Sequence, residues 1–499
     1  MANIKPPTDT NTEMAWTVPG PKSTPIVGTT GNTFRFTQDP IGYSNQLFQD
    51  YGPMVSLCEQ GGTNLFTPFE KCPGTVIVHG PDLIRQARTP HSQWNLTPLS
   101  MTLYPMEAVS NRKQPLKHFL VGLWGVNGDD HRLQRRLMMP AFHTRHIQSY
   151  WQDMVNITQS SLSHLRPGTT VNLVEETRLL AMRIVTKTLF GEDSGKAGQG
   201  VGHLLEQALA VLSQPLTTLM PYDIGGLPYR RFLNLIACFD REMRGIISAK
   251  RARQSKDNDV LSMLIQARDE ETGISLSETE LLGHVGSLFA AGHETTSLAL
   301  GWTVLLLSQH PDIAADLMDE LGAVLQGDPP RLDQLDQLPL LERVIKESLR
   351  LIPPAPFTWR YNNQIVDLGG YSLPVGTEVY CSIYATHHMP DLYENPNCFD
   401  PSRWERINPD MWEYMPFSAG SRLCMGAAFA MMELKIVLSI MLQTFRMEFV
   451  PSVSVDRYGI ITIAPKNGLP MHLHYPDRNF TAGVGGVKGN IREMVQLPV

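Results

Sequence analysis

Residues 417–426 read Phe417-Ser-Ala-Gly-Ser-Arg-Leu-Cys-Met-Gly426 and place one cysteine, Cys424, in a loop bracketed by glycines. The apolar run that follows, 427–442, predicts a helix. Gly420 and Gly426 allow sharp turns that bring backbone amides to the sulfur, and the helix start adds its positive end. This setting suits a metal-binding thiolate, because a buried charge must be compensated. The alternative is a buried structural cysteine, as a lone cysteine usually is.

The decapeptide resembles the haem-binding loop of the cytochromes P450, whose signature is Phe-x-x-Gly-x-Arg-x-Cys-x-Gly. The resemblance implies that Cys424 is the axial ligand of a haem b iron and that O2 is a co-substrate. Cysteine ligation pushes electron density to the iron and favours O–O cleavage. Arg422 is expected to meet a haem propionate, and Phe417 belongs to the same cofactor-binding set. Ser418 and Ala419 are less common choices in this loop, but they remove no required group.

A second motif, Ala291-Gly-His-Glu-Thr-Thr296, lies inside a long apolar segment, 277–309, that predicts a helix. Gly292 costs about 1 kcal/mol against alanine there, and threonine hydroxyls bond back to the preceding turn. The stretch is either a small-residue packing spot or a functional site. It resembles the distal-helix motif of the family. By that resemblance Thr295 and Glu294 are catalytic and deliver protons during oxygen activation, while Ala291 leaves space above the haem.

A third constellation consists of Glu347-Ser-Leu-Arg350 and the segment Phe399-Asp-Pro-Ser-Arg-Trp404. Glu347 and Arg350 share one helix face. By itself such a pair is usually a solvated salt bridge of small value. The segments resemble the Glu–Arg–Arg cluster of the family, which implies that Glu347, Arg350 and Arg403 hold the cysteine loop in place and take no part in the chemistry.

The segment Gly128-Asp-Asp-His-Arg-Leu-Gln-Arg-Arg136 is basic and predicts a helix. His131 and Arg135 are four residues apart and therefore share a face. The alternative is an ordinary solvated face. The pair resembles the family's Trp/His-x-x-x-Arg, which binds haem propionates. Arg132 and Arg136 then point to the proximal surface, where we expect them to join Arg343 and Lys346 in docking an electron donor.

A zinc site must be weighed for Cys381, His387, His388 and Cys398. Zinc sites prefer tighter ligand pairs than these. The stretch 384–391 instead resembles an ordinary segment of the family that packs near the cysteine loop.

Composition excludes several classes of protein. The chain is 42% hydrophobic and 18% charged, with a formal net charge of −7, which gives no reason to expect nucleic acid. The six cysteines include no Cys-x-x-Cys pair, so a disulfide framework is not expected and a reducing, cytoplasmic location fits. The N-terminus has no apolar run near 18 residues, so we expect neither an anchor nor a signal peptide.

Helical patterning dominates residues 129–350, and short strands are expected near 53–58, 74–79, 364–382 and 446–474. The pattern predicts a mainly α, α+β fold, and the resemblance implies the cytochrome P450 helical prism with a small antiparallel β region. We expect an irregular segment at 1–38, one domain at 39–475 and an extended tail at 476–499. A faint similarity at 383–388 and 427–438 is to soluble cyanobacterial members.

These observations predict a haem-thiolate monooxygenase that hydroxylates or epoxidises an apolar small molecule, such as a fatty acid or terpenoid. The sequence has no dinucleotide motif and no iron–sulfur cysteine set, so electrons must come from a separate ferredoxin or flavodoxin-type donor. The protein is expected to be a monomer. A haem-thiolate peroxygenase or isomerase and a non-enzymatic haem-based gas sensor are the alternatives.

The sequence does not name the substrate. Five segments are candidates for the pocket, namely 94–107, 205–222, 287–295, 354–359 and 458–461. Their apolar residues are Trp94, Leu99, Met101, Leu103, Leu209, Leu212, Phe289, Pro356, Phe357 and Ile460. Because they carry few charges, we expect specificity to come from shape.

Overall fold

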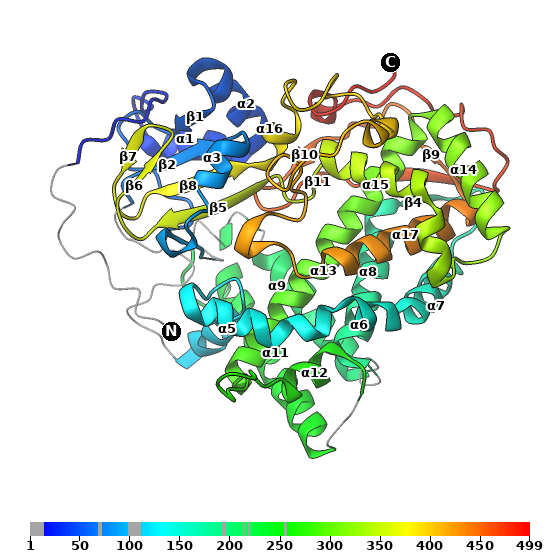
Figure 1. The fold of residues 1–499 in the computed structure, drawn as a ribbon, viewed down its shortest axis with the longest axis horizontal. Coiled ribbons are helices and arrows are strands. Elements are labelled where there is room, and N and C mark those ends of the chain that lie inside the picture. Colours follow the sequence, from blue (N-terminus) through cyan, green and yellow to red (C-terminus); the bar gives the residue numbers. More distant parts are fainter. Residues whose placement is uncertain are drawn as a thin grey trace.

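The computed structural model describes residues 14–67, 72–97, 111–191, 196–212, 214, 216–217, 220–253 and 257–499. Helices make up most of the molecule, and a mixed sheet with α1, α2 and α3 occupies one end (Figure 1). The fold is therefore mainly α with small sheets, as the sequence predicts.

The helices of the first half are α1 (Thr29–Gln38), α2 (Pro40–Tyr51), α3 (Pro81–Gln86), α4 (Gln114–Leu120), α5 (Gly128–Met138), α6 (Thr144–Ser149), α7 (Trp151–Leu162), α8 (Leu173–Phe190), α9 (Lys196–Leu212) and α11 (Pro228–Ala252). The later helices are α12 (Val260–Gln266), α13 (Glu278–Ser308), α14 (Pro311–Leu325), α15 (Pro339–Leu351), α16 (Ile383–His387) and α17 (Ala427–Thr444).

The largest sheet has the strand order β1-β2-β8-β5-β3, and its strands are β1 (Met54–Ser56), β2 (Thr75–Val78), β8 (Glu378–Ser382), β5 (Phe357–Asn362) and β3 (Trp94–Asn95). The β2–β8 pair is parallel and the other pairs are antiparallel, so the β region is small and mainly antiparallel, as predicted, with one parallel ladder in addition. The reason is that β8 returns to β2 after the whole helical region, and not through a hairpin.

Three smaller sheets are antiparallel. Their strands are β4 (Thr170–Asn172), β12 (Pro470–His474) and β9 (Arg446–Phe449) in one sheet, β6 (Val366–Leu368) and β7 (Tyr371–Leu373) in a second, and β10 (Arg457–Tyr458) and β11 (Ala464–Pro465) in a third. The turn between β10 and β11 contacts the candidate functional site.

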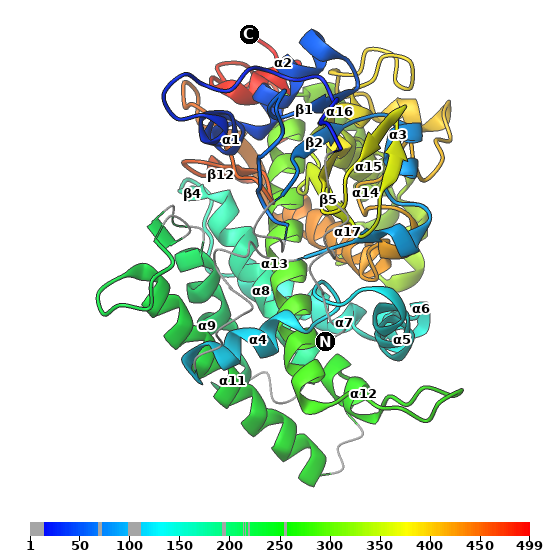
Figure 2. The same ribbon diagram turned by 90° about the vertical axis from the view of Figure 1, so that its left-hand side faces the viewer.

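Helix α13 runs through the middle of the molecule (Figure 2). It begins with a capping box in which the Ser277 hydroxyl accepts from the Glu280 amide and the Glu280 carboxylate accepts from the Ser277 amide. It packs against α8, α4 and α15. The helix is therefore a core element, and any solvent-accessible stretch within it needs an explanation.

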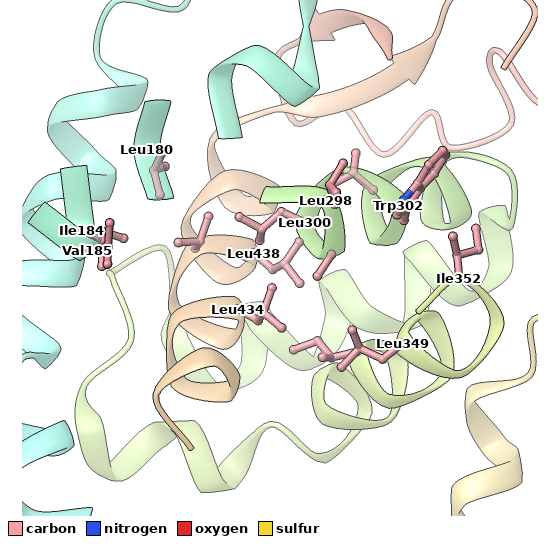
Figure 3. Close-up of a cluster of buried hydrophobic side chains, with 14 of the residues drawn as sticks. Leu180, Ile184, Val185, Leu298, Leu300, Trp302, Leu349, Ile352, Leu434 and Leu438 are labelled. Carbon is pink, nitrogen blue, oxygen red and sulfur yellow. The ribbon is translucent and has the colours of Figure 1, made fainter. Parts of the chain in front are cut away.

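The main hydrophobic core lies where α8, α13, α15 and α17 meet (Figure 3). Leu180 of α8, Leu300 and Trp302 of α13, Leu349 of α15 and Leu438 of α17 are all buried there. Burial of such side chains contributes about 1.5–3 kcal/mol each. This packing fixes α13 relative to α17, the helix that follows the cysteine loop.

Among the described residues, α17 alone is long and apolar enough to cross a membrane. Its residues 432–441 are all buried within the protein, including the charged Glu433 and Lys435. Lys435 bonds to the Glu342 carboxylate at 2.8 Å. These contacts are those of a core helix.

Two expectations about the ends of the chain need correction. Residues 29–38, expected to be irregular, form α1, and Phe36 anchors it in the core by edge contacts with Phe357 and Tyr380. The tail at 476–499 contains a short 3-10 helix, η8 (Asn490–Glu493), and Ile491 and Met494 are fully buried. In both segments tertiary packing of apolar side chains overrides weak local patterning.

Candidate functional site

The Cys424 loop is closed by a hydrogen bond of 2.9 Å from the Cys424 amide to the Phe417 carbonyl. Gly420 has φ of +68°, and a Cβ there would meet the Trp412 ring at 3.2 Å. Only glycine adopts this conformation without strain and also leaves room for the ring. The loop leads directly into α17, so the sulfur lies beside the helix N-terminus as predicted.

The Cys424 side chain is reached by solvent, but protein surrounds it on most sides. That surrounding raises the pKa of the thiol, whereas the Gly426 amide and the positive charge of Arg135 lower it. The sulfur is therefore accessible to solvent but largely enclosed by protein, next to a cation contributed by α5.

Arg422 ties the cysteine loop to the segment before α5. Its guanidinium donates to the carbonyls of Leu123 at 2.7 Å and Val126 at 2.6 Å, and to Asn127 Oδ1 at 2.8 Å. Its Nε is buried without a partner. Burial and the neighbouring Arg135 and Arg88 lower its pKa to about 9.

Three further arginines and the histidine His131 gather around Arg422. We call the set the cationic cluster, and its members are Arg88, His131, Arg135, Arg360 and Arg422. His131 is 1% exposed, and neither ring nitrogen has a partner. Burial lowers its pKa to about 3, with Arg422 as the next cause. Burial also lowers the pKa of Arg360 far below the usual value, and Arg88 and Arg422 add to the effect.

The described residues place no carboxylate on the cationic cluster: none forms an ion pair or hydrogen bond with its arginines. Arg88 donates to the Ser418 hydroxyl at 2.5 Å and Arg360 to the Trp359 carbonyl at 2.6 Å, and Arg88 Nη1 is buried without a partner. Buried cations are normally paired. The cluster therefore fits a ligand that carries carboxylates, as the propionates of the haem implied by the sequence resemblance would be.

One stretch of α13 is accessible although the helix is a core element. Between Leu281 and Leu307 the half-buried residues are Leu288, Ala290, Ala291, Gly292, Glu294 and Thr295, and all others in this span are buried. Leu288, Ala291 and Thr295 are spaced by three or four residues and share one face. The predicted distal motif thus supplies most of the solvent-accessible residues in this span of the core helix.

The two predicted catalytic residues are not bonded to each other. The Thr295 hydroxyl donates to the Ala291 carbonyl at 2.7 Å, as expected for a threonine within a helix. The Glu294 carboxylate accepts a hydrogen bond of 3.1 Å from the Thr462 hydroxyl, in the turn between β10 and β11. Sequence reasoning did not single out Thr462.

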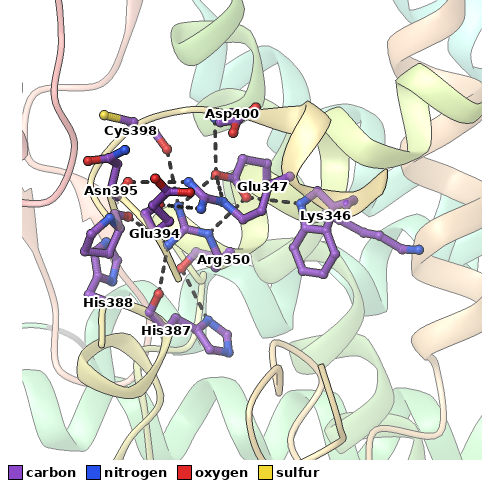
Figure 4. Close-up of polar contacts among 12 residues, drawn as sticks. Lys346, Glu347, Arg350, His387, His388, Glu394, Asn395, Cys398 and Asp400 are labelled. Carbon is purple, nitrogen blue, oxygen red and sulfur yellow. Dashed lines mark hydrogen bonds and ion pairs between the residues drawn. The ribbon is translucent and has the colours of Figure 1, made fainter. Parts of the chain in front are cut away.

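Glu347, Arg350 and Arg403, which we call the Glu347 cluster, lie together as predicted. Figure 4 shows Glu347 and Arg350 joined within a network of polar contacts. Glu347 and Arg350 are fully buried and form bonds of 2.9 and 2.8 Å, and Arg403 Nε lies 3.2 Å from Glu347 Oε1. Arg350 also donates to the carbonyls of His387 and Pro396 at 2.8 Å. The cluster joins α15 to residues 390–416, the meander that precedes the cysteine loop.

The histidines weighed for zinc contact backbone groups. His387 Nε2 accepts from the Met415 amide at 2.9 Å, and His388 lies 2.8 Å from the Tyr384 carbonyl and 3.1 Å from that of Met494. No group of three potential ligands is placed to hold a metal ion within the described part of the chain. These histidines instead join the meander to α15 and the tail.

The cations expected to dock an electron donor are each paired with a carboxylate. Their partners are Asp129 for Arg132, Asp269 and Glu271 for Arg136, Glu405 for Arg343 and Glu342 for Lys346. This patch is therefore closer to neutral than the sequence indicates, because nearby acidic residues offset it.

The candidate pocket residues divide into two groups. Leu209, Leu212 and Ile460 are half-buried and can line accessible space, whereas Trp94, Phe289, Pro356 and Phe357 are buried in the core. Leu99, Met101 and Leu103 lie outside the described residues. Placing Trp94, Phe289, Pro356 and Phe357 at a pocket wall is therefore wrong, because packing fills their surroundings.

Sequence reasoning missed Arg88, Arg360 and His91. The His91 ring lies edge-on to His131 with centroids 5.7 Å apart, and its Nδ1 is 2.9 Å from the Ser421 hydroxyl. One signal was available for Arg360, since it is a lone cation within the otherwise uncharged strand β5. Arg88 and His91 had no such signal, because only the fold brings them to the cysteine loop.

The family model described as Cytochrome P450 matches residues 18–460. Cyclooctatin synthase of Streptomyces melanosporofaciens is 34% identical over 343 residues, which cover 67% of this chain and 74% of that protein. Pentalenene oxygenase of Streptomyces avermitilis is 32% identical over 352 residues, covering 69% and 78%. The ultra-long-chain fatty acid omega-hydroxylase of Homo sapiens is 29% identical, covering 70% and 71%.

A solved structure of retinoic acid-bound cyanobacterial CYP120A1 superposes with a TM-score of 0.76 at 24% identity, covering 93% of this chain and all of that one. The cytochrome P450DA heme domain gives a TM-score of 0.77 at 23% identity. At such identities these likenesses concern the fold. Taken with the family match and the named monooxygenase relatives, they lead to one conclusion: the chain belongs to the cytochrome P450 family and is a haem-thiolate monooxygenase by class.

Proposed function

We propose that the protein binds haem b through the Cys424 thiolate and uses O2 to hydroxylate or epoxidise an apolar small molecule of the terpenoid or fatty acid kind. One observation carries the proposal: Cys424 lies beside a largely buried cationic cluster to which no carboxylate among the described residues is paired. The relatives named for terpenoid and fatty acid oxidation support this substrate class.

Each residue of the site has a separate task. The cationic cluster, with Arg422, His131 and Arg135 from the predicted set, would hold the haem propionates by charge-assisted hydrogen bonds. Phe417 would fix the loop through its carbonyl, which accepts from the Cys424 amide. When bound, the haem supplies thiolate-assisted O–O cleavage. Ala291, with its small side chain, would leave room for O2 and substrate.

Protons would be handled by Thr295 and Glu294. Thr295 Oγ1 holds a proton that it donates to the Ala291 carbonyl, and the same hydroxyl can accept one from a neighbouring water. Glu294, half-buried at the edge of the accessible stretch, would resupply that proton. Electrons would come from a separate ferredoxin or flavodoxin-type donor in the cytoplasm.

The test is the spectrum of the reduced carbon monoxide complex. Cys424→Ser should lose the strongly red-shifted Soret band that thiolate ligation gives, because a serine oxygen does not supply a thiolate. Cys58→Ser, which alters a buried cysteine in the sheet region, is the matched control and should keep the band. A Cys424→Ser protein that retains it would overturn the assignment.

A further inference from the structure

The hydroxyl of Thr462 holds the acid of the proposed proton path. Thr462 Oγ1 donates to Glu294 Oε1 at 3.1 Å, while the Thr295 hydroxyl is engaged by the Ala291 carbonyl. The carboxylate is thus directed towards the β10–β11 turn. A hydrogen bond to an ionised carboxylate is stronger than one between neutral groups, so this contact decides where Glu294 rests.

The turn that carries Thr462 is fixed without this contact. The Ile463 amide donates to the Pro354 carbonyl at 2.8 Å, and the Ile463 carbonyl accepts from the Trp302 indole at 3.1 Å. Gly459 has φ of +122°, and a Cβ there would meet the Thr462 carbonyl oxygen at 2.0 Å. The hairpin is therefore already attached to α13, and the Thr462 hydroxyl is not needed to hold it.

The same hairpin carries solvent-accessible side chains. Tyr458 is 48% exposed and Ile461 is 46% exposed, whereas Thr462 is half-buried. A threonine hydroxyl both donates and accepts. The Thr462–Glu294 bond thus joins a solvent-exposed turn to the accessible stretch of α13.

We propose that Thr462 is a positioning residue that holds the Glu294 carboxylate at the solvent-accessible β10–β11 turn, where the carboxylate is resupplied with protons from solvent. The inference rests on the proposed function of Glu294 and Thr295. For each proton that it passes inward, Glu294 takes one from solvent at the turn, so the two protons consumed in a turnover leave the carboxylate unchanged. The arrangement explains why the acid faces Thr462 and not Thr295.

The central experiment uses the haem-loaded protein with a surrogate electron donor and compares Thr462→Val with Thr462→Ser. Valine keeps the branched shape but cannot donate, whereas serine keeps the hydroxyl. In the valine variant, product formed per NADPH should fall about tenfold, the scale of one hydrogen bond to a charged group, and hydrogen peroxide should rise. The serine variant should remain within about twofold of wild type on the same scale. Thr481→Val, at an exposed threonine in the tail, is the control and should not change coupling.

A double-mutant cycle shows whether Thr462 acts through Glu294. In a Glu294→Gln background, adding Thr462→Val should cause no further loss, because the group that it positions is already gone. The solvent deuterium isotope effect on turnover should rise in Thr462→Val and return towards wild type in Thr462→Ser. An additive loss in the cycle, or a valine variant with unchanged coupling, would overturn the inference.

The outcomes separate this inference from the proposed function. If Thr295→Ala and Glu294→Gln both leave coupling unchanged, the proposed proton path itself is wrong and Thr462 falls with it. If those variants uncouple turnover but Thr462→Val does not, only the role of Thr462 is wrong. A loss in both Thr462→Val and Thr462→Ser together with a lowered melting temperature would show a structural tie, which also overturns the positioning role.

Discussion

Two buried sets of charges flank the cysteine loop, and they differ in whether the chain completes them. In the Glu347 cluster, every cation reaches Glu347 or a backbone carbonyl, and Trp404 Nε1 adds a hydrogen bond of 3.1 Å to the carboxylate. In the cationic cluster, His131 and Arg422 keep buried nitrogen atoms without partners. A complete cluster stabilises the fold, whereas an incomplete one indicates a ligand of opposite charge.

The difference is clearest between two arginines that are both buried, one in each cluster. Arg350 and Arg360 are 0% and 5% exposed, so solvent compensates neither charge. Arg350 is compensated within the protein by Glu347 at 2.8 Å. No carboxylate in the described part of the chain pairs with Arg360, and burial depresses its pKa. Burial alone therefore does not distinguish a structural arginine from a ligand-binding one, but the partner does.

The largest effect is expected in the complete cluster. Glu347→Ala leaves two buried cations uncompensated, so the free energy of unfolding should fall by about 3–5 kcal/mol. Chemical denaturation, or the yield of folded protein where the variant does not accumulate, measures this loss. Asp333→Ala removes an exposed partner of Arg331 and should change little. A stable Glu347→Ala protein would show that the cluster behaves like a surface bridge.

A loss of different kind is expected in the incomplete cluster. Arg360→Met removes an uncompensated buried charge, so the apoprotein should be as stable as wild type or more stable. Haem should instead dissociate about 10–100-fold faster, since one charge-assisted hydrogen bond is lost. Haem transfer to an apo-acceptor measures that rate, with Arg331→Met as an exposed-arginine control. A destabilised apoprotein with normal haem retention would contradict the comparison.

The sequence predicted the members of these clusters unevenly, for a physical reason. Glu347 and Arg350 lie on one helix and are visible as a spacing, as are His131 and Arg135. Arg360 reaches the cationic cluster from β5, through pairing that sequence periodicity does not encode. The orientation of Glu294 depends on the hairpin turn far along the chain. Local motifs are thus readable from sequence, whereas contacts between distant segments require the fold.

The smallest expected effect is a pH dependence of stability that comes from His131 of the cationic cluster. The pKa of His131 is lowered to about 3 by burial first and then by Arg422, against 6.5 in the unfolded chain. As the pH falls below 6.5, His131 takes up a proton in the unfolded chain but stays neutral in the folded protein. The free energy of unfolding therefore decreases between pH 6.5 and about 3.

At pH 5 this loss for His131 is about 1–2 kcal/mol, and His131→Gln apoprotein should lack it. His284, His79 and His388 also have lowered pKa values, but their contributions cancel in this comparison because both proteins retain them. Denaturation at pH 7 and pH 5 measures the difference. Haem carboxylates would offset the surrounding arginines and raise the pKa of His131, so the difference should shrink in the loaded protein. An equal pH dependence with and without haem would show that no carboxylate enters the cationic cluster.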